Sequence, residues 1–223
     1  MNSILSNIII TVNDKLYVKN PETSPLGKKI IEHSILMIDQ IGFESFTFKK
    51  LGECIGSNES SIYRYFESKH KLMLYLSSWY WGWIEYRLVF ATNNLSIPLE
   101  KLKKAITIVT EKIEDDSSTA HINEGILNRI IISEFTKTIL TKEVDEENKE
   151  GVFLVYKSVI NRITDMIVAV NPDYKFAKSL ASSIVEGALH QHFLKNHLKT
   201  ITNCNETISP TDFYIDLVQR ITK

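Results

Sequence analysis

Hydrophobic residues recur in this chain mainly at intervals of three and four, which is the period of an amphipathic helix. From Gly27 onward, Ile31, Ile35 and Ile38 form one stripe of this kind. Gly42 follows where a helix could end, because glycine is common just after the last turn. The pattern predicts a first helix from about Gly27 to Gly42.

Several further helices are indicated by capping residues placed just before apolar stripes. Thr47 is suited to cap a short second helix that ends at Gly56, and Asn58 is suited to cap a third. Ser68 is suited to cap a long fourth helix that runs to about Phe90. The remaining periodic segments predict helices over residues 97–115, 120–141, 147–170, 174–198 and 210–222.

The first 25 residues depart from the helical period. Residues 8–12 and 16–18 are β-prone runs on either side of polar turn residues, and Pro21 follows. This pattern indicates a short β-hairpin. We therefore predict an all-α fold of about nine to ten helices, with a three-helix N-terminal module, a C-terminal helical bundle and a short N-terminal hairpin. The expected regions are 1–25 for the extension, 26–80 for the module and 81–223 for the bundle.

The length and composition agree with a small module joined to a larger one. The chain has 223 residues, which is more than one typical domain but less than two large ones. Its 43% hydrophobic and 24% charged residues are typical of a globular protein rather than a disordered one. The formal net charge of -1 gives no global attraction to nucleic acid, so any DNA-binding surface must be local.

The sequence indicates a cytoplasmic chain without a membrane segment. Cys54 and Cys204 are too few for a disulfide framework and lack the spacing of a zinc ribbon, which fits a reducing compartment. The apolar residues 8–10 follow no basic region, so a signal peptide is not expected. No apolar run approaches the roughly 20 residues that a membrane span needs.

The second and third helices carry the main functional signal. A short turn at Gly56 joins them, which describes a helix-turn-helix inside a three-helix core. In this arrangement the apolar residues hold the second helix across the third and fix the angle at which the third helix enters the major groove. These apolar positions are Phe48, Leu51, Ile55, Ile62 and Phe66.

The same region resembles the DNA-binding signature of the TetR family of transcriptional regulators. The resemblance covers roughly residues 26–80, whereas the rest is similar only in being a run of helices. Gly52 and Ser57 depart from the alanine and valine that are common there. The matching positions are Gly42, Phe43, Phe46, Thr47, Leu51, Gly56, Ile62, Tyr63, Phe66, Ser68, Lys69 and Leu72.

The resemblance implies double-stranded operator DNA as a partner. Asn58 would cap the recognition helix, and Glu59, Ser60, Ser61 and Arg64 would face the bases. Arginine can bind guanine and a carboxylate can accept from cytosine. The alternative is that the exposed side chains are ordinary solvated helix residues. The expected contacts to phosphates are Thr47, Tyr63, Tyr65 and Lys69, and Lys49 is a further DNA-binding candidate beside the recognition helix.

The C-terminal helices are expected to form a homodimer and to bind an unknown small-molecule effector. Reading a pseudo-palindromic operator requires two recognition helices in register. Small residues over 176–198 permit close helix approach, either between subunits or within one. An aromatic concentration on the fourth helix could line a ligand pocket, or could simply be core. The candidate ligand-binding residues are Trp79, Trp83, Tyr86, Phe153, Tyr156 and His190.

No cofactor, metal or catalytic motif is expected. Glu186 and His190 share a helix face, but His192 is turned away and no third ligand has matching spacing. The chain lacks the motifs of nucleophilic hydrolases, P-loops and dinucleotide folds. The leading hypothesis is a ligand-responsive repressor. The alternative is a helical small-molecule or partner-binding protein whose helix-turn-helix does not read DNA, and an enzyme using Glu186 and the histidines comes last.

Overall fold

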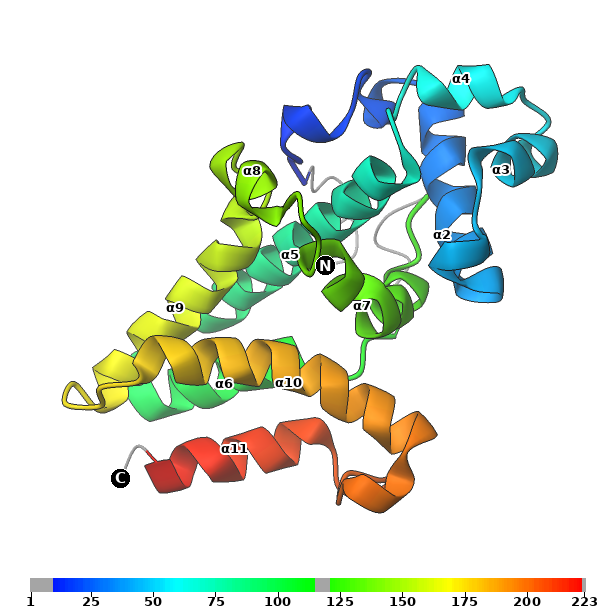
Figure 1. Cartoon of the computed structure of the whole chain (residues 1–223). Coiled ribbons are helices and arrows are strands. Elements are labelled where there is room, and N and C mark those ends of the chain that lie inside the picture. The colour runs from blue at the N-terminus through cyan, green and yellow to red at the C-terminus, as the bar shows by residue number, and fades with distance from the viewer. Residues whose placement is uncertain (1–9, 115–120, 222–223) are drawn as a thin grey trace. The chain divides into compact units, whose positions relative to one another are not determined.

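The computed structural model describes residues 10–114 and 121–221, and over these residues the fold is all-α, as predicted (Figure 1). They contain ten α-helices and three short 3-10 helices, with no strand. The chain divides into two units, which we describe separately. The first comprises Met1–Gly82 and Ile113–Phe153, and the second comprises Trp83–Lys112 and Leu154–Lys223.

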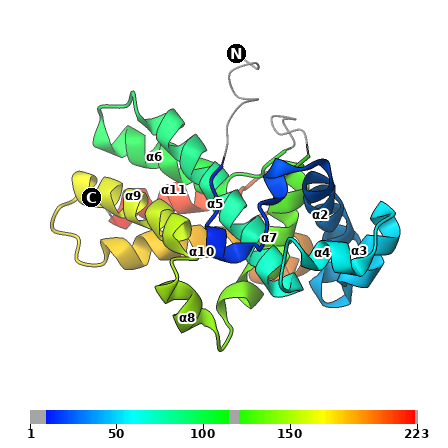
Figure 2. The same ribbon diagram turned by 90° about the horizontal axis from the view of Figure 1, so that it is seen from above.

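The first unit is built around helix α2, which packs against α3, α7 and the turn η2 (Figure 2). Helices α3 and α4 in turn pack on each other. Isoleucine, leucine and phenylalanine side chains fill this core because each helix buries its apolar stripe. The elements are η1 (Asp14–Leu16), η2 (Pro21–Thr23), α2 (Pro25–Ser45), α3 (Phe48–Ile55), α4 (Glu59–Tyr63), the first part of α5 (Lys69–Thr92), α7 (Glu124–Ile139) and α8 (Val144–Lys149).

The N-terminal extension forms two 3-10 turns where the sequence indicated a hairpin. The Asn13 and Asn20 side chains each accept a hydrogen bond of 2.9 Å from the backbone N–H two residues later, which closes a tight turn instead of a strand. Leu16 is fully buried and anchors the segment. Residues 8 and 9 of the expected first strand lie outside the described residues.

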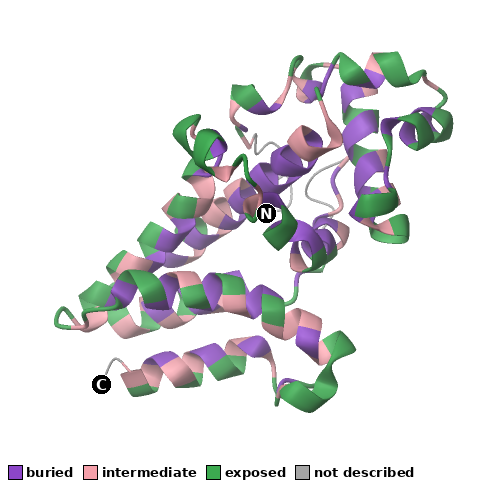
Figure 3. Ribbon diagram, in the orientation of Figure 1, coloured by how far each residue is buried: buried purple, intermediate pink, exposed green. Residues whose placement is uncertain are grey.

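The second unit is a helical bundle. Helix α9 packs against both α6 and α10, and α11 packs against the same two helices. Each helix buries one side and exposes the other, as the purple and green faces in Figure 3 show. The elements are the rest of α5, α6 (Pro98–Thr110), α9 (Leu154–Val170), α10 (Ala177–His197), η3 (Lys199–Ile201) and α11 (Pro210–Ile221).

The single helix expected over 147–170 is wrong, because the chain forms α8 and α9 there. Gly151 interrupts the run with a φ of 82°, in the left-handed region that ends helices. Val152 then donates to the carbonyl of Glu147 at 3.0 Å, which closes the turn after α8. The helical period of the side chains continues across this break, so the pattern alone did not reveal it.

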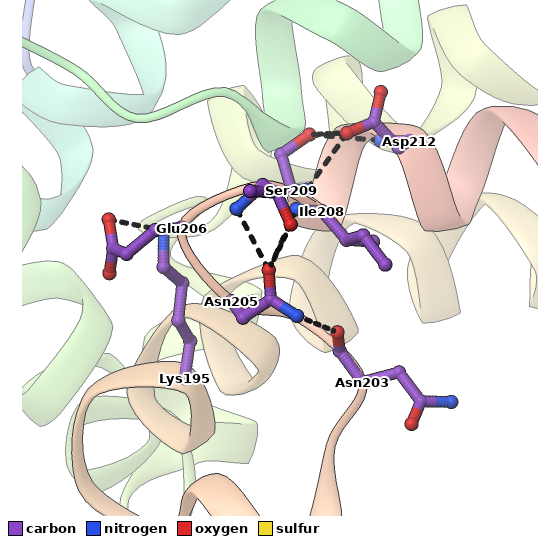
Figure 4. A network of polar contacts seen from close by, with 8 residues as sticks. Lys195, Asn203, Asn205, Glu206, Ile208, Ser209 and Asp212 are labelled. Atoms are coloured by element: carbon purple, nitrogen blue, oxygen red, sulfur yellow. Dashed lines mark hydrogen bonds and ion pairs between the residues drawn. The ribbon is translucent and has the colours of Figure 1, made fainter.

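The connection between α10 and α11 is an ordered polar loop (Figure 4). The Asn205 side chain accepts from the backbone N–H groups of Thr207 at 2.8 Å and Ile208 at 3.0 Å. Asp212 accepts from the backbone N–H of Ser209 at 2.8 Å, while the Ser209 hydroxyl accepts from the Asp212 N–H at 3.1 Å. This reciprocal pair is a capping box, and it defines the start of α11.

Candidate nucleic-acid interface

The turn between α3 and α4 brings two backbone segments very close together. Gly56 ends α3 with φ 68° and ψ 37°, a left-handed conformation that favours glycine. Ser57 then donates to the Gly52 carbonyl at 2.9 Å. A Cβ atom on Gly52 would lie 2.8 Å from the Ser57 carbonyl oxygen, which is too close for an unshifted backbone. The glycine at position 52 therefore fits a close approach that sets how α3 meets α4.

Asn58 organises the start of α4, as the sequence predicted. Its Oδ1 accepts from the backbone N–H of Ser61 at 2.8 Å, which is the hydrogen bond of a helix N-cap. The same oxygen also accepts from the hydroxyls of Ser61 at 2.6 Å and Ser60 at 2.8 Å. Both hydroxyl protons therefore point inward to Asn58, and the serine oxygens are left to act as acceptors.

The exposed side of α4 carries Glu59, Tyr63 and Arg64. The helix has only five residues, and Arg64 is its C-cap with helical φ and ψ. The Tyr63 ring packs edge-on against Phe48, with 5.0 Å between the ring centroids, yet Tyr63 remains 49% exposed. Glu59 and Arg64 are exposed as well. These three side chains are available to a partner that lies along α4.

Tyr65 differs from its predicted neighbours, because only 4% of it is exposed. Its hydroxyl shares a hydrogen bond of 2.8 Å with Ser24, the N-cap of α2, and its carbonyl accepts from Val18 at 2.8 Å. Lys19 Nζ lies 5.2 Å from the centre of the ring. The structure thus uses Tyr65 to fasten the N-terminal extension to the helix-turn-helix. Ser24 is 41 residues away, so no local pattern could have indicated this pairing.

Lys69 also has partners within the fold. Its Nζ donates to the carbonyls of Phe43 and Glu44, each at 3.1 Å, and lies 4.8 Å from the centre of the Phe43 ring. These carbonyls belong to the last turn of α2, where a cation is favoured by the helix dipole. Lys69 therefore stabilises the end of α2, and the residue is intermediate in exposure.

Thr47 and Lys49 lie at the start of α3, on the surface. The Thr47 hydroxyl accepts from the Lys50 N–H at 3.2 Å and so caps the helix, as predicted. The Lys50 side chain reaches back to the Ser45 carbonyl at 2.8 Å. Lys49 is exposed, and a helix start with an adjacent lysine is well suited to a phosphate group.

The six residues expected to bind an effector are divided between the two units. Trp79 and Phe153 belong to the first unit and are buried. Trp83, also buried, belongs to the second unit, where the Arg87 guanidinium lies 4.7 Å from the centre of its ring. Tyr86 stacks on Phe90 in the same unit. That these residues line one effector site stays a prediction.

The polar residues of α10 have separate partners. The Tyr156 hydroxyl donates to the Glu186 carboxylate. Burial raises the pKa of Tyr156, and the Glu186 carboxylate raises it further. His192 Nε2 lies 2.8 Å from the Thr110 carbonyl, and burial lowers its pKa despite this hydrogen bond. His190 is exposed. Within residues 10–114 and 121–221, no three His, Cys, Asp or Glu side chains are grouped as metal ligands.

Two comparisons concern the sequence, and a third the fold. Residues 30–76 match the profile of bacterial regulatory proteins of the tetR family. A search of curated protein sequences found no significant match.

No helix in the described part of the chain is long and apolar enough to cross a membrane.

Solved structures share the fold at low sequence identity. AibR in complex with isovaleryl coenzyme A and operator DNA superposes with a TM-score of 0.55 at 14% identity, covering 87% of this chain and 98% of AibR. The ketosteroid transcriptional regulator KstR2 of Mycobacterium tuberculosis gives 0.55 at 13%, covering 97% of each chain. The superantigen PfiT gives 0.58 at 13%, covering 89% of this chain and 97% of PfiT.

Proposed function

Residues 30–76 match the tetR family of bacterial regulatory proteins, and from this match we propose that the chain is a ligand-responsive transcriptional repressor. It would act as a homodimer on a palindromic operator in the cytoplasm, and it would not be an enzyme. AibR, which shares the fold, has been crystallised with both a small molecule and operator DNA. We propose that this chain likewise binds both a small molecule and operator DNA, but not that it binds the same small molecule.

The exposed side of α4 carries the proposal. Glu59, Tyr63 and Arg64 project from a five-residue helix whose start is fixed by Asn58 and whose base is packed on Phe48. So short a helix is marginal without tertiary support, so the surrounding contacts present these side chains in a defined orientation. Arg64 is proposed to bind guanine, while Thr47, Lys49 and the Tyr63 hydroxyl bind phosphates.

Selection of genomic DNA fragments with the purified chain tests this function. We expect an enriched palindromic sequence, with half-sites about 34 Å apart or a multiple of that distance. Arg64→Ala should weaken binding by about 10- to 150-fold and relax the preference at one base pair, whereas Lys49→Ala should weaken all sequences alike and reduce the salt dependence. If the folded chain enriches no sequence, the alternative of a ligand- or partner-binding protein is favoured.

A stripe on α10 is proposed as the centre of the homodimer interface. Exposed positions recur there at alternating intervals of three and four, which is the spacing of a seam between paired helices. Small side chains in the middle of the stripe would let two copies of α10 approach closely. The stripe comprises Phe176, Ser179, Ser183, Glu186 and His190.

The oligomeric state of a charged variant tests the interface. Ser183→Arg should convert the dimer into a monomer in light-scattering measurements, because in a two-fold interface each arginine would face its symmetry copy. Asn196→Arg is the matched control, since Asn196 is exposed on another side of the same helix. A dimer that survives Ser183→Arg would show that another surface pairs the subunits.

A further inference from the structure

The side of α5 that faces α7 and α8 contains buried polar atoms without a hydrogen-bond partner. His70, Ser77, Ser78 and Trp81 lie within about 100° of one another around the helix at 3.6 residues per turn. The Ser77 and Ser78 hydroxyls are both buried and form no hydrogen bond. A buried hydroxyl without a partner is costly, so each of these two hydroxyls favours a hydrogen-bonding group from outside the chain.

An acidic group lies at one end of this face. His70 Nε2 is 2.8 Å from Glu147 Oε1, and the Glu147 side chain is only 6% exposed. The second oxygen, Oε2, is buried and accepts no hydrogen bond. Lys71, the nearest lysine on α5, pairs instead with Glu150 at 3.7 Å. One carboxylate oxygen is thus left for a donor from outside the chain.

An aromatic pair lies at the other end. The rings of Trp81 and Phe135 have centroids 5.3 Å apart, and both residues are buried. His70 and Trp81 are separated by about 16 Å along the axis of α5, and the two serines lie between them. The face therefore runs from a carboxylate, past two hydroxyls, to a flat apolar surface.

We infer that this face of α5 binds an elongated amphipathic amine, with its ammonium group on Glu147, a hydrogen-bonding group at Ser77 and Ser78, and a flat apolar group against Trp81 and Phe135. The inference deepens the proposed function, because this amine would be the effector. An ammonium group can donate to the orphan oxygen, whereas an anionic ligand would place like charge against a buried carboxylate. The assignment thus differs from the acyl coenzyme A bound by AibR.

Calorimetry with three probes on the full chain tests the assignment. The first is N-naphthylacetyl-1,5-diaminopentane, the second is its N-acetylated neutral form, and the third is naphthylacetyl-6-aminohexanoate. We expect the amine to bind at least about tenfold more tightly than the other two, as for hydrogen bonds that involve charged groups. Equal or tighter binding of the neutral or anionic probe would overturn the assignment.

Two sets of variants locate the amine. Glu147→Gln retains an acceptor for His70 and should weaken the amine by about 10- to 100-fold without weakening the neutral probe. Glu146→Gln is the matched control, because Glu146 is exposed and pairs with Lys149. Ser78→Ala should weaken the amine by about 2- to 10-fold. An unchanged affinity for the amine in Glu147→Gln would mean that the ammonium group does not bind Glu147 and would overturn the inference.

Operator binding separates this inference from the proposed function. If the chain binds its selected DNA but no amine, the amine assignment fails and the regulator stands. If the chain binds the amine through Glu147 but enriches no DNA, the regulator fails and the amine site stands. If it does both, the amine should change the affinity for DNA, because an effector acts by binding one conformation more tightly than another.

Discussion

The helix-turn-helix and the C-terminal bundle are held together in different ways. Side chains cap the starts of α2, α3 and α4, through Ser24, Thr47 and Asn58. Helices α6 and α10 have Ile97 and Phe176 at their N-cap positions, where no side chain forms a capping hydrogen bond. The small module therefore has a hydrogen-bonded cap at each of these three helix starts, which fixes their direction. In the bundle, α6 and α10 depend on close packing along their length, and α11 begins at the Ser209–Asp212 capping box.

The largest effect is expected in the bundle, at the contact between α10 and α11. A Cβ atom on Gly187 would lie 2.1 Å from the Tyr214 hydroxyl oxygen and 3.2 Å from the ring carbon that bears it. Gly187→Ala should therefore lower the free energy of unfolding by about 2–3 kcal/mol, as overpacking does in a tight core. Denaturant unfolding of the single variant measures this loss.

Tyr214→Phe provides the control. Burial, and then the nearby Cys204, raise the pKa of Tyr214 to about 12, so the hydroxyl that phenylalanine removes is uncharged at neutral pH. The double variant Gly187→Ala with Tyr214→Phe should recover most of the stability. If it recovers none, close packing at Gly187 is not what holds α10 to α11, and the contrast between the two regions weakens.

Gly52 in the module should give a smaller loss of stability on substitution, although helix propensity alone predicts a gain. Gly52→Ala should gain about 1 kcal/mol from helix propensity. Its Cβ would lie 2.8 Å from the Ser57 carbonyl oxygen, and displacing that backbone costs up to about 3 kcal/mol. We expect a net loss of about 1–2 kcal/mol in thermal unfolding, with weaker operator binding. A stabilised variant would contradict the tight-turn account.

Local signals explain how much of the module could be predicted. The caps at Thr47 and Asn58 and the left-handed residue Gly56 are set by hydrogen bonds within a few residues, so their residue types reveal them. The all-α fold followed from periodicity for the same reason. The predicted contacts of Glu59 and Arg64 with bases remain predictions, although the structure leaves both side chains exposed.

Distant contacts explain what could not be predicted. Tyr65 and Lys69 have partners within the fold, at Ser24 and at the end of α2, that no local pattern indicated, and their contact with phosphates stays a prediction. The orphan oxygen of Glu147 depends on α5 and α8, which are 77 residues apart at His70. Partners at such separation leave no trace in a local pattern, and neither the candidate effector residues nor the amine site could be assembled from spacing alone.

Removing a cap should affect the module by about 1 kcal/mol. Asn58→Ala deletes the acceptor for the Ser61 N–H and for two hydroxyls, and the loss of an N-cap typically has this magnitude. Faster amide hydrogen exchange at Ser61, with unchanged exchange in α10, would show that the effect is local. Asn58→Asp keeps the acceptor and should leave stability and exchange near those of the parent chain.

The smallest expected effect is on the pH dependence of the free energy of unfolding, which should differ between the two regions. The pKa of His192, in the bundle, is lowered from its ordinary 6.5, chiefly by burial. Its neutral form therefore stabilises the fold fully above pH 6.5, and this contribution is lost as the pH falls through the lowered pKa. Burial would raise the pKa of Glu22, in the first unit, but the hydrogen bond and charge of His121, with help from Tyr75, outweigh it.

The pKa of Glu22 is consequently below its ordinary 4.5, so its contribution is present above pH 4.5 and is lost at more acid pH. His192→Gln should flatten the dependence of unfolding free energy on pH below 6.5, because glutamine can still donate to the Thr110 carbonyl without titrating. Glu22→Gln should flatten only the window below 4.5. Urea titrations at several pH values would distinguish the two, and loss of both windows in either variant would mean that the two regions do not titrate separately.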